Sequence, residues 1–181
     1  DYRGRSIEVF RQQTGTACRG YRAPSFEHSP ASLAALRRAG VAYDSSLMGF
    51  DHPYSIDGLV QVPVTWTIDD ALYFRYTNGP RDKTHPANPN AVLESWIEEF
   101  EGVREWGGLC MITVHDWISG RAQRLRLLDK FFSHIANAEA IDFFPLFRPF
   151  VLGFAIMIFP SVLSVINGVM EPAVTVTGKM V

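Results

Sequence analysis

The sequence predicts an α/β fold in which helices alternate with the strands of a mainly parallel sheet or barrel. Short apolar runs typical of strands alternate along the chain with longer amphipathic stretches typical of helices. One apolar run, at positions 109–114, ends abruptly at His115, and other predicted strands also end at charged residues. Parallel sheets and barrels bind their ligands at the carboxyl ends of the strands. We therefore expect a functional site at that end of the sheet.

Length and composition favour one globular domain. The 181 residues are 47% hydrophobic, which is enough for a sizeable core. A net charge of −2 argues against a protein that binds nucleic acid by neutralising phosphates. Cys18 and Cys110 are too few for a disulfide framework and lie in apolar runs, so we expect buried thiols. No signal peptide opens the chain, which begins at Asp1 rather than at a methionine, so we expect the sequence to begin within a longer protein.

The first two predicted helices have recognisable ends. Residues 3–15 carry apolar side chains at helical spacing and end at Gly15, a residue type that often follows the last turn of a helix. Residues 29–40 form the clearest helix of the first half. Ser29 can cap its first turn, Pro30 suits that turn, and a glycine follows the last one.

Three short strands lie between and after these helices. Residues 18–23 and 41–44 are short runs typical of strands, and the second ends at an aspartate. Residues 59–66 form a longer run of alternating apolar residues. Pro63 lies inside it, which predicts an edge strand or a bulge because proline has no N–H to donate.

The second half alternates helix, strand and helix. A polar, proline-rich loop leads to a helix capped near Asn88 that ends at Gly107. A buried strand is predicted over residues 109–115, and a further helix over residues 121–136. The expected buried side chains of the two helices are Leu93, Trp96, Ile97, Phe100 and Val103, then Leu125, Leu128, Phe131, Phe132 and Ile135.

Charged side chains end or follow four of the predicted strands, and we expect them to meet at one edge. These side chains are Arg22, Asp44, Asp69, Asp70 and His115. The residues alone leave structural explanations open as well: an ion pair for the arginine, turn capping or solvation for the carboxylates, and a satisfied core position for the histidine.

The remaining histidines are expected at the surface or in caps. They are His28, His52, His85 and His134. No two histidines have the spacing His-x-x-x-His, so the residues predict no metal site.

Four sequence motifs, taken in order, resemble those of a known family. They are GYRAPSF from Gly20, YDSSLMGFDHPY from Tyr43, VPVTWTIDD from Val62 and VHDWISGRAQR from Val114. The sequence is similar in these motifs to polysaccharide deacetylases, the NodB-homology group or carbohydrate esterase family 4, and particularly to the peptidoglycan deacetylase and allantoinase-like branch. The resemblance covers about residues 1–140.

The resemblance implies a deformed (β/α) barrel and hydrolysis of a C–N bond, usually of an N-acetyl group on an amino sugar. It also implies a divalent metal, commonly zinc, held by an aspartate and two histidines. That metal would polarise the amide and activate a water, a carboxylate would act as base, and a histidine would protonate the leaving amine.

The motifs imply a role for particular residues. His115 matches the histidine that protonates the amine, and Arg22 matches the arginine that orients the catalytic aspartate. Asp69 or Asp70 would fix the tautomer of the histidine. Phe26, Trp66 and Trp117 would line the substrate pocket as aromatic side chains, and Arg121 would begin a helix whose N–H groups could bind an anion.

The chain departs from the family at its beginning. The Asp-Asp pair and the His-x-x-x-His element of the family precede the arginine motif, but only 21 residues precede Arg22, and none is a histidine. The resemblance therefore implies an incomplete barrel that lacks its N-terminal strands and its metal ligands, and a chain that is inactive alone. Ser25 also replaces an aromatic residue of the family, and Asp116 replaces a proline.

The chain departs from the family again at its end. The family pattern fades after about residue 140, and residues 141–181 form a divergent apolar tail. The uncharged stretch 149–170 is long enough to cross a bilayer. A membrane span, a buried strand and helix, and a shifted reading frame remain three explanations, so the compartment, cytoplasm or cell envelope, stays open.

Three functions follow from these observations. The first is metal-assisted removal of N-acetyl groups from an amino-sugar polymer. The second is an allantoinase-like hydrolysis of a small cyclic amide. The third is a carbohydrate-binding or membrane-tethered remnant that keeps the aromatic residues but has lost catalysis.

Overall fold

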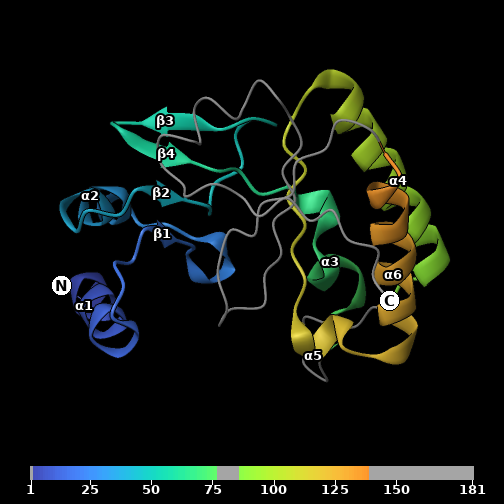
Figure 1. Ribbon diagram of the computed structural model, residues 1–181, viewed down its shortest axis with the longest axis horizontal. Helices are drawn as coiled ribbons and strands as arrows, with labels where there is room; N and C mark the ends of the chain where they lie inside the picture. The colour runs from blue at the N-terminus through green and yellow to red at the C-terminus, as the bar shows by residue number, and fades with distance from the viewer. Residues whose placement is uncertain (1, 77–85, 139–181) are drawn as a thin grey trace.

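A short, mainly parallel sheet forms one side of the molecule (Figure 1). The computed structural model describes residues 2–76 and 86–138. The strands lie in the order β1-β2-β4-β3, and the first three are parallel. Their bounds are Gly20–Tyr21 for β1, Tyr43–Asp44 for β2, Tyr54–Ile56 for β3 and Leu59–Gln61 for β4. The α/β class is therefore confirmed, with an open sheet in place of a closed barrel among the described residues.

The antiparallel hairpin of β3 and β4 was not predicted. Asp57 and Gly58 connect the two strands with φ angles of 48° and 81°, which suit a tight two-residue turn between twisted strands. The predicted strand 59–66 is also shorter than expected. Its ladder ends at Gln61, two residues before Pro63, and Trp66–Ile68 form a 3₁₀ turn, η2.

The two predicted N-terminal helices are confirmed. Helix α1 spans Tyr2–Thr14 and α2 spans Pro30–Arg38. The hydroxyl of Ser32 accepts a hydrogen bond from the backbone N–H of Ser29, which satisfies a donor that the helix start would leave unpaired. Leu36 is fully buried, together with Val41 and Leu59, so α2 packs against the sheet.

The larger core lies between α4, Pro89–Trp106, and α6, Ala122–Ala136, which run side by side in Figure 1. The predicted cap at Asn88 is confirmed, since its Oδ1 accepts from Asn90 N. Trp96 and Phe131 meet edge to face with ring centroids 5.5 Å apart. One prediction on α6 is wrong: Leu125 is exposed, and Leu127 is buried instead, because the inward stripe of the helix passes through positions 127, 131 and 135.

The predicted strand 109–115 is a buried extended segment with a single parallel bridge, between Asp69 and Thr113. Its other backbone N–H groups find irregular partners. Leu109 donates to the carbonyl of Asp51, and Met111 donates to the hydroxyl of Thr65. The segment therefore has the expected burial and direction without a ladder, and it passes between the sheet and the helix pair (Figure 1).

The tail 141–181, including the stretch 149–170, lies outside the described residues. The proposed domain division and the membrane span therefore stay predictions. Within residues 2–76 and 86–138, the structure contains no helix that is long and apolar enough to cross a membrane.

Candidate active site

The structure brings Asp70 and His115 together at the end of the buried segment. The Nδ1 atom of His115 lies 2.6 Å from Oδ1 of Asp70, which is fully buried. Asp70 begins the short helix α3, Asp70–Phe74, and His115 precedes the one-turn helix α5, Asp116–Ser119. The predicted orienting carboxylate is therefore Asp70 rather than its neighbour.

The remaining contacts of Asp70 set the orientation of the imidazole. Its Oδ2 accepts hydrogen bonds from the backbone N–H of His115 at 2.8 Å and from the hydroxyl of Ser119 at 2.5 Å. Because the carboxylate only accepts, Nδ1 of His115 carries a proton. Its Nε2 has no partner among the described residues, and the side chain is 36% exposed. The imidazole can therefore exchange a proton with a ligand through Nε2.

Asp69 performs a different task. Its Oδ1 accepts from Ala71 N at 2.8 Å, so it caps α3. Burial raises the pKa of Asp69, although the cap hydrogen bond and the nearby His115 and Arg22 each favour the charged form. A buried carboxylate with a raised pKa is therefore adjacent to the Asp70–His115 pair.

Arg22 lies within electrostatic reach of two carboxylates. Burial lowers its pKa to about 10, while Asp69 and then Asp44 act in the opposite direction. The guanidinium lies 5.7 Å from the ring centroid of Phe26, which is half-buried. The predicted convergence of strand-end charges is thus confirmed in part: Asp44 and Asp69 are each electrostatic neighbours of Arg22, and Asp69 is a neighbour of His115.

The other predicted substrate residues are exposed. Trp117 lies against the imidazole, with its ring centroid 5.9 Å from that of His115. Trp66 is about half exposed on the 3₁₀ turn that precedes Asp69. Arg121 is exposed and forms no ion pair with the described residues. It precedes α6, whereas His115 precedes α5, so the two residues lie at the starts of different helices.

Asp69, Asp70 and His115 form a candidate group for a metal ion that sequence reasoning missed. One ligand atom from each lies within 4.8 Å of the others. However, both oxygens of Asp70 and Nδ1 of His115 are used in contacts with each other or with nearby N–H and O–H groups. The described residues do not supply the aspartate and two histidines that the resemblance implies. They fit a paired carboxylate and imidazole better than a metal centre.

Sequence reasoning also missed the position of His28. This histidine was expected at the surface, but its side chain is only 6% exposed, and its Nε2 lies 3.0 Å from Oδ2 of Asp44. No spacing pattern connects positions 28 and 44, because the pairing of β1 with β2 brings them together. His52 and His134 are partly or fully exposed as expected, and His85 lies outside the described residues.

Comparisons with known proteins find similar chains among deacetylases and an allantoinase. A peptidoglycan deacetylase of Helicobacter pylori is 26% identical over 167 residues, which cover 76% of this chain and 57% of that protein. A structure from Mycobacterium smegmatis described as a polysaccharide deacetylase is 31% identical, with a TM-score of 0.69, over 75% of this chain and 49% of the other. The structure of Puue allantoinase is 18% identical, with a TM-score of 0.62, over 75% and 45%, which shows a shared fold.

The chain spans about half the length of these relatives. A family model described as homologues of TraJ from Bacteroides conjugative transposon matches residues 108–181, fewer than half of the chain. That range holds both the His115 segment and the tail.

Proposed function

We propose, from the premise that this chain carries part of a polysaccharide deacetylase domain, that it serves a hydrolase that removes N-acetyl groups from an amino-sugar polymer. The observation that carries the proposal is the Asp70–His115 pair, with Nε2 of the imidazole facing away from the carboxylate. The H. pylori relative is named as acting on peptidoglycan, which is such a polymer.

His115 is the general acid in this proposal. When the C–N bond of the amide breaks, the departing nitrogen takes the proton from Nε2 and leaves as an amine. The imidazole returns to its neutral form with a proton on Nδ1, which Asp70 holds. Trp117 beside the imidazole offers an apolar face to a sugar ring.

Arg22 and Asp69 surround the reacting group. Arg22 supplies positive charge near Asp69, as expected of an arginine that orients a carboxylate. A divalent metal is implied for the complete domain, where it would polarise the amide. Since the described residues do not fit that metal, we expect the 181-residue chain to be inactive alone.

Allantoinase-like hydrolysis of a cyclic amide is the second candidate. Puue allantoinase shares this fold and is matched by the same share of this chain as the deacetylase from M. smegmatis, so the fold alone does not separate the two reactions. A remnant that binds sugar without catalysis is the third candidate, and it would keep Trp66 and Trp117 exposed as they are.

The test uses the protein encoded by the whole reading frame that contains this chain. We expect acetate release from N-acetylated chitooligosaccharide or peptidoglycan, and none of the ring-opened product from allantoin. His115→Ala should lower turnover by about 10²- to 10⁴-fold, the usual contribution of a general acid. His134→Ala is the matched control, because this histidine also pairs with a carboxylate, at 2.8 Å, but on α6.

Unchanged acetate release in His115→Ala would exclude the acid role. Ring opening of allantoin without acetate release would favour the second candidate. Binding of the oligosaccharide with neither reaction would favour the remnant.

A further inference from the structure

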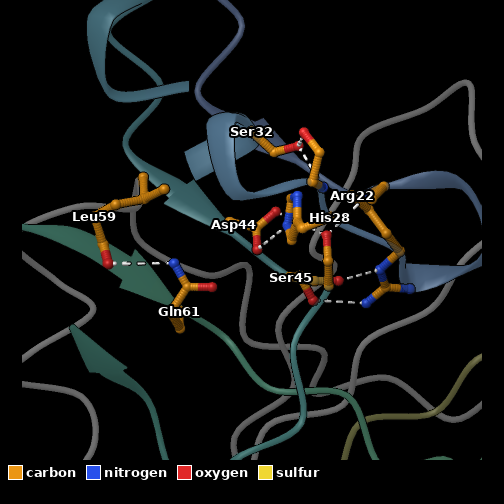
Figure 2. A network of polar contacts seen from close by, with 10 residues as sticks. Arg22, His28, Ser32, Asp44, Ser45, Leu59 and Gln61 are labelled. Atoms are coloured by element: carbon orange, nitrogen blue, oxygen red, sulfur yellow. Dashed lines mark hydrogen bonds and ion pairs between the residues drawn. The ribbon is translucent and has the colours of Figure 1, made fainter. Parts of the chain in front are cut away.

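The loop of residues 22–28 is tied at its first end to the residues that follow β2. Nε of Arg22 donates to the carbonyl of Ser45 at 2.8 Å, and the terminal nitrogen donates to the Ser45 hydroxyl at 2.7 Å (Figure 2). The backbone N–H of Ala23 donates to the hydroxyl of Ser46 at 2.8 Å. The guanidinium and the backbone next to it are therefore both held.

The other end of the loop is tied to the same short segment. Nε2 of His28 contacts Oδ2 of Asp44, and the side chains are 6% and 0% exposed (Figure 2). The second oxygen of this carboxylate, Oδ1, accepts from the hydroxyl of Ser46 at 2.8 Å. Asp44 thus connects the two ends of the loop through one side chain.

Between these ends the backbone is strained. Ser25 and Phe26 have φ angles of 53° and 61°, which residues other than glycine rarely adopt. Such conformations persist where the surrounding contacts determine them strongly. Two consecutive residues of this kind need firm anchors on both sides, and Asp44 supplies or supports both anchors.

We propose that His28 and Asp44 are positioning residues that clamp the loop of residues 22–28, so that Arg22 and Phe26 are held toward the candidate site. The functional meaning of the clamp rests on the proposed function, because that function makes Arg22 a site residue. The clamp itself is a statement about the loop and can be tested without any substrate.

A histidine-to-glutamine exchange separates the hydrogen bond from the imidazole ring. The carboxylate of Asp44 can only accept, so the contact needs a proton on Nε2 of His28. Glutamine places an N–H donor at nearly the same distance from its backbone, whereas alanine has none. The buried Nδ1 of His28 has no partner among the described residues, so glutamine loses no other hydrogen bond there.

The readout is the exchange rate of the Arg22 Nε proton with solvent, followed by NMR on the full chain. That proton is held by Ser45, so it reports the position of the guanidinium directly. We expect His28→Ala to raise the rate by about ten- to a hundredfold, the range for losing a hydrogen bond to a charged group. His28→Gln should stay close to the parent, and His134→Ala, which removes a distant histidine–carboxylate pair, should not change it.

His28→Leu provides a second test in case the alanine variant does not fold. Leucine fills the space of the imidazole but has no N–H to donate to Asp44, so exchange at Arg22 should again rise. Unchanged exchange in His28→Ala or in His28→Leu would overturn the clamp. A protein without deacetylase activity would contradict only the proposed function, because exchange at Arg22 does not depend on turnover.

Discussion

At the scale of single residues, Asp70 is the group on which the candidate site depends most. It is fully buried and accepts three hydrogen bonds, two from His115 and one from Ser119. A buried carboxylate loses its hydration on folding, and hydrogen bonds of this kind offset that loss. The same contacts leave Nε2 of the imidazole directed outward.

Asp70→Asn is expected to impair both stability and turnover. Asparagine keeps an oxygen for the N–H of His115 and the hydroxyl of Ser119, but its NH₂ group donates to Nδ1 of the imidazole and forces the ring proton onto Nε2. Losing the charged acceptor should cost about 1–3 kcal/mol in the free energy of unfolding. Turnover of the whole protein should fall by about a hundredfold or more, because the imidazole loses its orienting carboxylate. Urea unfolding and acetate release measure the two effects.

The matched control is Asp116→Asn. Asp116 directly follows His115 in the chain and is exposed, so its replacement should leave the free energy of unfolding within about 0.5 kcal/mol of the parent. Equal effects of the two substitutions would show that Asp70 has no special role.

Asp69 is expected to make the folded protein less stable as the pH rises, whereas most carboxylates have the opposite effect. Its pKa is raised by burial, so the folded protein binds this proton more tightly than the unfolded chain does. The stability that this group contributes is present below its unfolded pKa and is lost as the pH rises through the folded value. Asp69→Asn should therefore gain stability relative to the parent as the pH increases from 3 to 7.

Asparagine is a fair replacement at this position because its side-chain oxygen can still cap α3 through Ala71 N. Unfolding in urea at pH 3 and pH 7 measures the difference between the two proteins. A difference that shrinks or reverses toward pH 7 would contradict the raised pKa of Asp69.

At the scale of secondary-structure elements, replacing two different glycines by alanine should change the free energy of unfolding in opposite directions. Gly58, in the hairpin turn, has a φ of 81°, whereas Gly102 lies on the exposed face of α4. A Cβ atom added at either position would meet no atom within 4 Å, so only the backbone conformation matters. Gly58→Ala should cost about 1–2 kcal/mol, and Gly102→Ala should stabilise the chain by about 0.5–1 kcal/mol.

Thermal or urea unfolding of the two variants tests this pair. The hairpin turn explains the sign at Gly58, because alanine does not easily adopt a left-handed backbone. A neutral Gly58→Ala would mean that the turn between β3 and β4 has a different conformation in solution.

The elements also show which local signals were available. Caps at Asn88 and Ser29 and apolar stripes at helical spacing predicted α2, α4 and α6 with boundaries within two residues of those observed. The Asp57-Gly58 pair is a hairpin signal of equal strength that was overlooked. The pairing of the segment 109–115 could not be predicted from its own residues, because an apolar run indicates a buried extended segment whereas pairing depends on what lies beside it.

At the scale of the whole molecule, Cys110 reports global opening. It is fully buried, and burial raises the pKa of its thiol far above the usual range, so the reactive thiolate is scarce. Cys18 is only half-buried. We expect a thiol reagent to modify Cys18 in the native protein and Cys110 only through unfolding, so Gly58→Ala should accelerate the slow reaction and Gly102→Ala should retard it. Mass spectrometry measures the two modification rates. Equal rates for the two cysteines would contradict the burial of Cys110 in the core.

The amino-acid sequence determined the class of the fold, the helices and the place of His115 at the end of a buried apolar run. These depend on local patterns: caps, apolar periodicity and a strand-like run that ends in His115. Only the tertiary structure decided that Asp70 and not Asp69 orients the imidazole, and that His28 is buried against Asp44. Those contacts join residues 45 and 16 positions apart, and such pairs are chosen by the packing of β1, β2, α3 and α5 rather than by any spacing along the chain.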